Sequence, residues 1–176
     1  MSDVIIKDNF LNSKDCDFFV KWFEKYYSIL YSKFKNNHNG TDCIKFSRML
    51  GEPDFTPNIF KKLFSDISIY IKEIDNDLFI NYLEIVKWPE GQYQSLHKDF
   101  EWHPYTSILY LNDDYEGGQT KVGDQIIQPK KGTIISFKGK DISHQVLKVT
   151  KGNRYTVPVW YSTLLTFREE YSMIKV

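Results

Sequence analysis

Hydrophobic residues follow a helical spacing in the first part of the chain. From residue 16 to residue 30 the apolar positions recur every three or four residues, which predicts an amphipathic helix capped by Asn12 or Ser13. A second helix is predicted over residues 57–75, because proline suits a first helical turn and the apolar positions that follow share one face. The polar, glycine-containing stretch 35–42 between them predicts a loop.

The pattern changes near residue 83, where short β-favouring runs alternate with turn residues. The predicted strands are 83–88, 106–111, 119–122, 125–127, 133–137, 145–149 and 154–161. Helices followed by strands indicate an α+β fold with the helices packed on the outer face of a sheet. We expect one domain over 1–176, with helical support over about 12–76 and a β core over about 83–163.

Composition narrows the class of protein. The 23 basic and 23 acidic residues give no net charge, and no basic stripe stands out, so we expect no nucleic-acid partner. Two cysteines make no disulfide framework, and no signal peptide or membrane-spanning run is visible, so a soluble, cytoplasmic protein is expected. Frequent Lys, Asn, Ile and Tyr suggest an AT-rich genome, hence a microbial cell or a virus-infected host cell.

His97 and Asp99 are the first candidates for metal chemistry. Side chains two residues apart on a strand point to the same face, so this imidazole and this carboxylate can converge on one point. They are two of the three ligand types in the facial triad of non-haem iron oxygenases. The pair is weak evidence by itself, because four histidines and frequent aspartates produce it by chance.

Two more positions extend this candidate site. His144 opens the penultimate predicted strand, where a jelly roll would bring it opposite the first pair; alone, it fits a hydrogen-bonded structural histidine better. Arg154 begins the last predicted strand. If the Arg154 side chain points inward, its planar guanidinium can bind a carboxylate through two N–H groups. If Arg154 instead lies on an edge strand, its side chain is on the surface. Thr156 shares the face of Arg154, so its hydroxyl can serve the same carboxylate.

The order His-x-Asp, a long gap, His, and a basic residue ten positions later resembles the 2-oxoglutarate/Fe(II) oxygenase superfamily. Segments spread over nearly the whole chain resemble its prolyl 4-hydroxylase branch. They are residues 10–16, 85–93 (IVKWPEGQY), 110–112 (YLN) with 116–118 (EGG), 129–133 (PKKGT) and 159–161 (VWY).

This resemblance implies a double-stranded β-helix, or jelly roll, with Fe(II) held by His97, Asp99 and His144. It implies 2-oxoglutarate as co-substrate, anchored by Arg154 and Thr156, together with O2 and with ascorbate as candidate reductant. The implied reaction hydroxylates a C–H bond of a prolyl residue in a peptide or protein and releases succinate and CO2. A small-molecule substrate such as a free amino acid, or a catalytically silent jelly roll that only binds a ligand, are the alternatives.

The chain departs from relatives near the expected co-substrate. Trp88 stands where relatives often have a tyrosine that hydrogen-bonds 2-oxoglutarate, so we assign Trp88 to co-substrate binding through its indole N–H. Leu109 stands where some relatives place another such tyrosine.

Substrate contacts are assigned to Tyr93, Trp102 and Trp160, and residues 36–57 are expected to form a lid. His103 either competes with His97 as a metal ligand, as in a zinc site, or lies in a polar loop at the rim. Oligomeric state is not predicted.

Overall fold

The computed structural model describes residues 4–34, 42–47 and 58–167, which form two helices and twelve strands. In chain order these are β1 (Val4–Lys7), α1 (Ser13–Phe34), β2 (Asp42–Ser47), α2 (Asn58–Ile74), β3 (Phe79–Pro89), β4 (Gln94–His97), β5 (Tyr105–Tyr110), β6 (Glu116–Gly117), β7 (Thr120–Val122), β8 (Gln125–Ile127), β9 (Ile134–Phe137), β10 (His144–Val146), β11 (Val149–Lys151) and β12 (Asn153–Ser162). Neither described helix is long and apolar enough to span a membrane.

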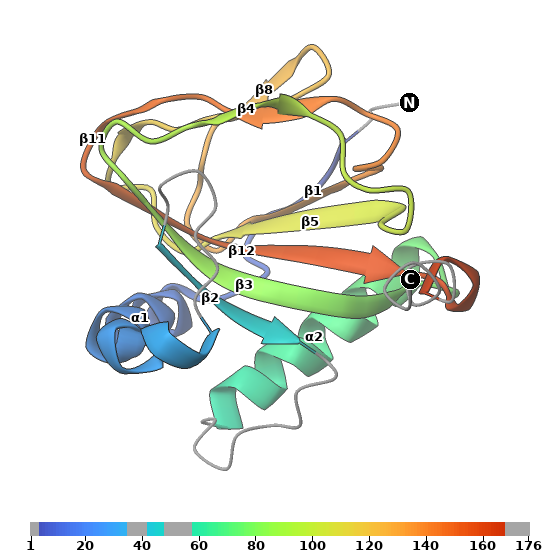
Figure 1. Cartoon of the computed structure of the whole chain (residues 1–176), viewed down its shortest axis with the longest axis horizontal. Helices are drawn as coiled ribbons and strands as arrows, with labels where there is room; N and C mark the ends of the chain where they lie inside the picture. The colour runs from blue at the N-terminus through green and yellow to red at the C-terminus, as the bar shows by residue number, and fades with distance from the viewer. Residues whose placement is uncertain (1–3, 35–41, 48–57, 168–176) are drawn as a thin grey trace.

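The strands form two facing layers. The larger sheet has the order β1-β9-β5-β12-β3-β2, and the smaller sheet has the order β4-β10-β7-β8. β6 and β11 make a separate two-stranded ribbon. Figure 1 shows the smaller sheet above the larger one, with both helices below the larger sheet. The predicted α+β jelly roll with helices on an outer sheet face is therefore confirmed.

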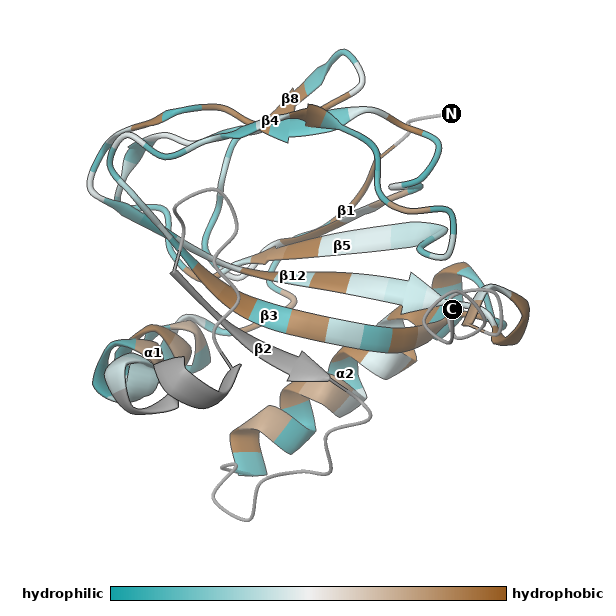
Figure 2. Cartoon of the chain, viewed as in Figure 1, coloured by the Kyte–Doolittle hydropathy of each residue, from teal (hydrophilic) through white to brown (hydrophobic). Residues whose placement is uncertain are grey.

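Strand β12 shows how the two faces of the larger sheet differ. From residue 155 onward its odd-numbered residues belong to the core cluster that also contains the buried residues of α1 and α2; they are Tyr155, Val157, Val159 and Tyr161. Each such buried side chain contributes about 1.5–3 kcal/mol. Arg154 and Thr156 point to the opposite face, toward the smaller sheet. Figure 2 shows the same alternation of hydrophobic and hydrophilic positions along β3 and α2.

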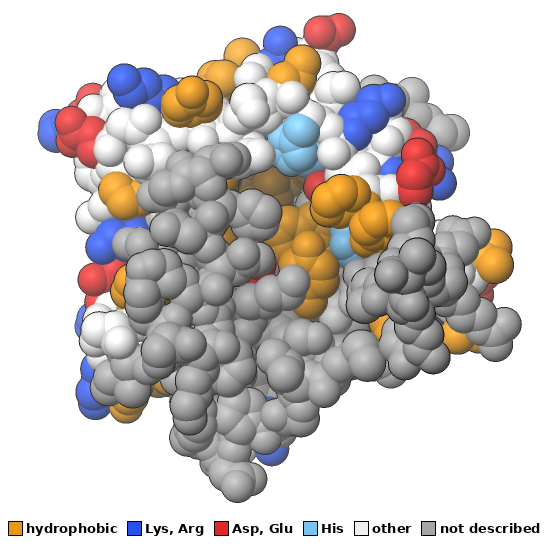
Figure 3. All heavy atoms as spheres, viewed as in Figure 1, with side chains coloured by type: hydrophobic (Ala, Val, Ile, Leu, Met, Phe, Trp, Pro, Cys, Tyr) orange, Lys and Arg blue, Asp and Glu red, His pale blue; other side chains and the backbone are white. Residues whose placement is uncertain are grey.

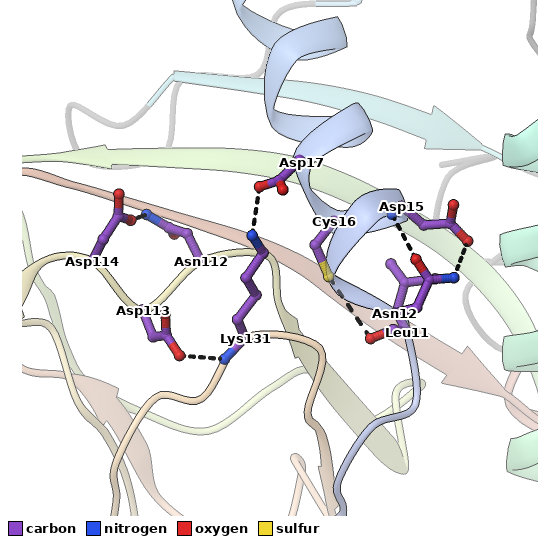
Figure 4. Close-up of polar contacts among 9 residues, drawn as sticks. All are labelled: Leu11, Asn12, Asp15, Cys16, Asp17, Asn112, Asp113, Asp114 and Lys131. Atoms are coloured by element: carbon purple, nitrogen blue, oxygen red, sulfur yellow. Dashed lines mark hydrogen bonds and ion pairs between the residues drawn. The ribbon is translucent and has the colours of Figure 1, made fainter.

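The first turn of α1 is fixed by side chains that Figure 4 shows. The Oδ1 of Asn12 accepts a hydrogen bond from the backbone N–H of Asp15 at 2.9 Å, which confirms Asn12 as the predicted cap. The ammonium of Lys131 donates to Asp17 at 2.5 Å, and its backbone N–H donates to the Asp113 carboxylate at 3.0 Å. These contacts fasten the helix to two loops of the β core.

The prediction missed two strands of the larger sheet. β1 and β2 lie at its two edges, where they pair with β9 and β3. β1 has only four residues and one of them, Val4, is buried, so its sequence carries almost no alternation. Its strand conformation depends on partners such as Phe137, more than a hundred residues away. Local pattern cannot supply that information.

Other boundaries differ from the predicted ones. α1 continues to Phe34, and the predicted strand 145–149 divides into β10 and β11. Of the expected lid at 36–57, only β2 is described; residues 36–41 and 48–57 lie outside the described residues, as does the stretch 35–41 of the predicted loop. The expectation of one domain over 1–176 stays a prediction.

Candidate metal and co-substrate site

Two short strands of the smaller sheet bring the candidate histidines together. His97 ends β4 and His144 opens β10, and the two residues are direct cross-strand partners. Their ring centroids are 4.3 Å apart. Asp99 lies close by, with its Oδ2 at 3.7 Å from the Nε2 of His144. Ligand atoms of all three residues lie within 4.8 Å of one another, so the structure gathers the three predicted ligands.

Backbone carbonyls fix the orientation of both rings. The Nδ1 of His97 lies 2.8 Å from the carbonyl oxygen of Ser95, and the Nδ1 of His144 lies 3.0 Å from that of Ile142. A carbonyl oxygen only accepts, so each Nδ1 carries a proton, and Nε2 is the ring nitrogen that is left to face a ligand. Burial lowers the pKa of His144, against the opposing charge of Asp99, so its imidazole is neutral near pH 7. Neutral imidazole is the form that binds a metal.

Asp99 is held by the larger sheet rather than by β4. β4 ends at His97, so the prediction that strand alternation places Asp99 beside His97 is wrong. The backbone N–H of Asp99 donates to the carbonyl oxygen of Gly139 at 3.0 Å. Its Oδ2 accepts a hydrogen bond from the Thr106 hydroxyl, and its Oδ1 accepts one from the indole N–H of Trp160 at 3.2 Å. Two strands of the larger sheet thus orient this carboxylate.

Gly139 makes room for that carboxylate. A Cβ built on Gly139 would collide with the Oδ2 of Asp99 and with the Oγ1 of Thr106. Gly139 does not have a positive φ, so the requirement for glycine here is one of space and not of backbone strain. No local sequence pattern signals this requirement, because it arises only when the turn after β9 meets the chain after β4.

This donor set fits the group that the sequence predicts. Two neutral imidazoles and one carboxylate are the ligands of the facial triad, which suits a non-haem Fe(II) ion and keeps other coordination positions open. Hydrogen bonds to the second ring nitrogen and to the carboxylate are the usual support of such ligands. Figure 3 shows a histidine side chain beside a hollow, with hydrophobic side chains at the base and on one side of the hollow.

Arg154 is almost completely enclosed between the two sheets. It is 1% exposed, and no carboxylate among the described residues pairs with it. Taking an unpaired guanidinium out of water costs on the order of several kcal/mol. The guanidinium carbon Cζ of Arg154 lies 5.2 Å from the ring centre of Trp88 and 5.6 Å from that of Tyr110. These cation–π contacts stabilise the charge only in part.

Hydrogen bonds around Arg154 leave protons without acceptors. The Oγ1 of Thr120 accepts from Tyr110 at 2.7 Å and from Arg154 at 3.2 Å. The Oγ1 of Thr156 accepts from the Trp88 indole at 3.3 Å and from Arg154 at 3.5 Å. A hydroxyl oxygen has two lone pairs, so both threonine protons remain to be donated. No acceptor for them is found in the described part of the chain, and the surroundings therefore fit an anion such as a carboxylate.

Sequence reasoning missed Tyr110 and Thr120 in this cluster. Leu109, which stands where some relatives have a co-substrate tyrosine, is fully buried in the core between the larger sheet and the helices. The next residue, Tyr110, points to Arg154, because a shift of one residue reverses the face of a strand. Thr120 lies on β7 in the other sheet and has no local signal at all. Trp88 does lie beside Arg154, but its N–H is already donated to Thr156.

The remaining candidates lie farther toward the surface. Trp160 stacks on Tyr82 with ring centroids 4.6 Å apart, and Trp102 stacks on the exposed Phe100 at 4.8 Å. Tyr93 is 57% exposed just before β4. Their assignment to substrate stays a prediction.

His103 lies in the loop between β4 and β5, as expected, but it is not exposed there. It is only 2% exposed, where its ring meets the edge of Tyr82, and it does not belong to the group of three metal-ligand candidates in the described structure. The expected place at the rim of the site is not found, because aromatic rings cover this histidine.

Together, the jelly roll, the His-Asp-His group and the enclosed arginine are the features expected of a non-haem iron oxygenase that uses a 2-oxo acid. Residues 81–162 match the model of the 2OG-Fe(II) oxygenase superfamily, and they include every residue of the site described above. This part of the chain is thus similar to that superfamily, and prolyl hydroxylases are among the proteins that it resembles in sequence and in fold.

Curated relatives are prolyl 3-hydroxylases. Human prolyl 3-hydroxylase 2 is 37% identical over 78 residues, which make up 40% of this chain but 11% of the human protein. Chicken prolyl 3-hydroxylase 1 is 34% identical over 71 residues, or 10% of its length. The chain thus matches only about a tenth of the length of these relatives.

Solved structures show the same fold over nearly the whole chain. The viral collagen prolyl hydroxylase of Paramecium bursaria Chlorella virus 1 has a TM-score of 0.69 at 21% identity, covering 93% of this chain and 97% of that one. A Trichoplax adhaerens prolyl hydroxylase, solved with a peptide fragment of hypoxia inducible factor, has a TM-score of 0.73 at 16% identity, covering 93% and 85%.

Replacing any one of the three ligand candidates should remove metal binding. We expect His97→Ala, Asp99→Ala and His144→Ala each to weaken Fe(II) or Mn(II) binding by more than about a hundredfold, because a lost ligand costs more than a lost supporting contact. Competition with a chelating dye measures the affinity. Lys98→Ala, an exposed change between two of the ligands, is the control. Unchanged affinity in all three variants would refute the assignment.

Gly139→Ala should weaken metal binding without touching a ligand. The new methyl group displaces the Asp99 carboxylate, and we expect a loss of about 10- to 100-fold in metal affinity. Thr106→Val removes the hydroxyl that donates to the same carboxylate and should act in the same direction. The matched control is Thr133→Val, which removes a hydroxyl bonded to Asp8. Equal metal affinity in Gly139→Ala and wild type would show that metal binding does not depend on the space that Gly139 leaves for the Asp99 carboxylate.

Proposed function

We propose that this protein is an Fe(II)- and 2-oxoglutarate-dependent dioxygenase that hydroxylates a C–H bond, with a prolyl residue of a peptide or protein as its substrate and succinate and CO2 as co-products. The observation that carries the proposal is Arg154, a buried cation whose two threonine neighbours, Thr120 and Thr156, each keep a hydroxyl proton to donate. A histidine and carboxylate cluster alone fits several metals and reactions. An added site for an anion is what a dicarboxylic co-substrate requires.

The residues divide into two groups of roles. His97, Asp99 and His144 would hold the metal, which when bound supplies O2 activation and the oxidation of the C–H bond. Arg154, with Thr156 and Thr120, would bind the distal carboxylate of 2-oxoglutarate. Trp88 and Tyr110 position the arginine between their rings and exclude water from it.

A prolyl substrate is supported by two kinds of relative. The curated relatives are prolyl 3-hydroxylases, and the structures of similar fold include prolyl hydroxylases, one of them with a peptide. These names differ in the ring carbon that is hydroxylated, so we propose the prolyl ring and leave its C3 and C4 positions to the assay. Tyr93, Trp102 and Trp160 are the proposed substrate contacts, because aromatic faces pack well against proline rings.

The alternatives are less well supported. A silent binding module would have no need for three oriented ligands together with an arginine held ready for an anion. A free amino acid or other small molecule as substrate is favoured by no observation on the described residues. Ascorbate as reductant and a cytoplasmic location in a microbial or virus-infected cell stay proposals from the sequence.

Turnover of the co-substrate tests the reaction class. Protein loaded anaerobically with Fe(II) and then exposed to O2 should convert 2-oxoglutarate to succinate slowly without substrate, and faster with a proline-containing peptide that it accepts. Succinate is quantified by mass spectrometry, and hydroxyproline isomers are separated after hydrolysis of the peptide. Asp99→Ala supplies the background rate. If folded, iron-loaded protein makes no succinate above that background, the dioxygenase proposal fails.

Arg154→Met tests the anchor separately from the metal. The thioether side chain fills similar space without charge, so we expect 2-oxoglutarate to bind more than about a hundredfold more weakly while metal affinity stays unchanged. Because a buried unpaired cation is removed, the ligand-free variant should melt at the same temperature as wild type or higher. Calorimetry gives the affinities, and Arg154→Lys, which keeps a charge, should lose less. If Arg154→Met binds 2-oxoglutarate as tightly as wild type does, another residue must bind the distal carboxylate.

A further inference from the structure

Tyr115 lies against the side chain of Arg154 although it is not part of the cluster described above. It comes between β5 and β6 and packs between two glycines. A Cβ on Gly118 would come within 3.1 Å of both the Cε2 of Tyr115 and the Cδ of Arg154, so the ring edge and the arginine stem meet at this glycine. On the other side, a Cβ on Gly152 would lie 3.4 Å from the Cβ of Tyr115.

Backbone conformation keeps both of these positions free of side chains. Gly118 and Gly152 have φ values of +64° and +80°, a region that other residues rarely adopt. The phenol ring can therefore reach the inner end of Arg154 without competition from a neighbouring side chain. A ring that only filled space there would need no hydroxyl.

The Tyr115 hydroxyl is buried and has no hydrogen-bond partner in the described structure, and the same is true of the Nε of Arg154. Most buried hydroxyl groups in proteins are paired, so two such groups close together call for an explanation. Burial raises the pKa of the Tyr115 phenol, and the charge of Arg154 and the approach of its N–H groups to the phenol oxygen oppose that rise, so the neutral phenol lies beside the guanidinium. A neutral phenol has one proton to donate.

An acceptor that satisfies both groups must lie at the Nε side of the guanidinium. The Nη1 and Nη2 atoms already donate to Thr156 and Thr120, whereas Nε–H and the Tyr115 O–H are uncommitted. Arginine binds carboxylates through two neighbouring N–H groups, and the pair of Nε and Nη2 is one such pair. A carboxylate bound there would receive the Tyr115 proton as well.

We propose that Tyr115 is a further co-substrate-binding residue, which donates its hydroxyl proton to the distal carboxylate of 2-oxoglutarate alongside Arg154. This inference rests on the proposed function, because it takes 2-oxoglutarate as the anion. It assigns to the loop before β6 a direct part in co-substrate affinity. It also explains why a buried hydroxyl is kept where the ligand-free protein offers it no partner.

Tyr115→Phe separates this role from a structural one. Removing a donor to a charged acceptor should weaken 2-oxoglutarate binding by about ten- to a hundredfold. Metal affinity should stay unchanged. Because the lost hydroxyl has no partner in the ligand-free protein, the melting temperature without co-substrate should not fall, while the rise in melting temperature on adding 2-oxoglutarate should shrink. Calorimetry and thermal melts of Fe(II)-loaded protein under argon measure all three, without any turnover.

Tyr70→Phe is the matched control. It makes the same chemical change at a hydroxyl that is bonded to Ser136 beneath the larger sheet, so it should lower the melting temperature and leave 2-oxoglutarate affinity unchanged. Equal 2-oxoglutarate affinity in Tyr115→Phe and wild type would overturn the inference. It would also be overturned if Tyr115→Phe lowered the melting temperature as much as Tyr70→Phe does, without a specific loss of 2-oxoglutarate binding. If wild type itself does not bind 2-oxoglutarate, the proposed function fails instead.

Discussion

The burial of Arg154 is the constraint on which the rest of the site depends. A guanidinium between two sheets costs on the order of several kcal/mol unless an anion meets it, and no described carboxylate does so. Strand β12 nevertheless turns Arg154 toward the smaller sheet, because the residues that alternate with it along the strand face the hydrophobic core between the larger sheet and the helices. The helices therefore do more than cover the sheet: their packing fixes which side chains of β12 face the site.

Both parts of the site draw on both sheets. The two histidines come from the smaller sheet, whereas Asp99 is oriented by Thr106 and Trp160 of the larger one. In the same way, Arg154 on β12 donates to Thr120 on β7. A change in the spacing of the sheets would therefore disturb metal ligands and co-substrate anchor together. This coupling follows from geometry alone and needs no moving element.

The sequence was informative where chemistry and strand alternation coincide. The pairing of Arg154 with Thr156 followed from their spacing, and the late His144 was placed at the start of a strand. It was silent where the site depends on pairing across long distances. Gly139 matters only because its turn meets Asp99, and Tyr110 could be told from Leu109 only once the register of β5 was known.

Several departures from ordinary packing among the described residues gather on the inner face of the larger sheet. On the outer face, apolar side chains fill the space between the sheet and the two helices, as close packing of a hydrophobic core requires. On the inner face lie an unpaired cation, two threonine protons without acceptors and the unpaired hydroxyl of Tyr115. Folding stability alone would favour apolar replacements at several of these positions. Because natural proteins break such rules mainly at functional sites, the concentration of these groups around one small volume is itself an argument that a specific anion completes the structure.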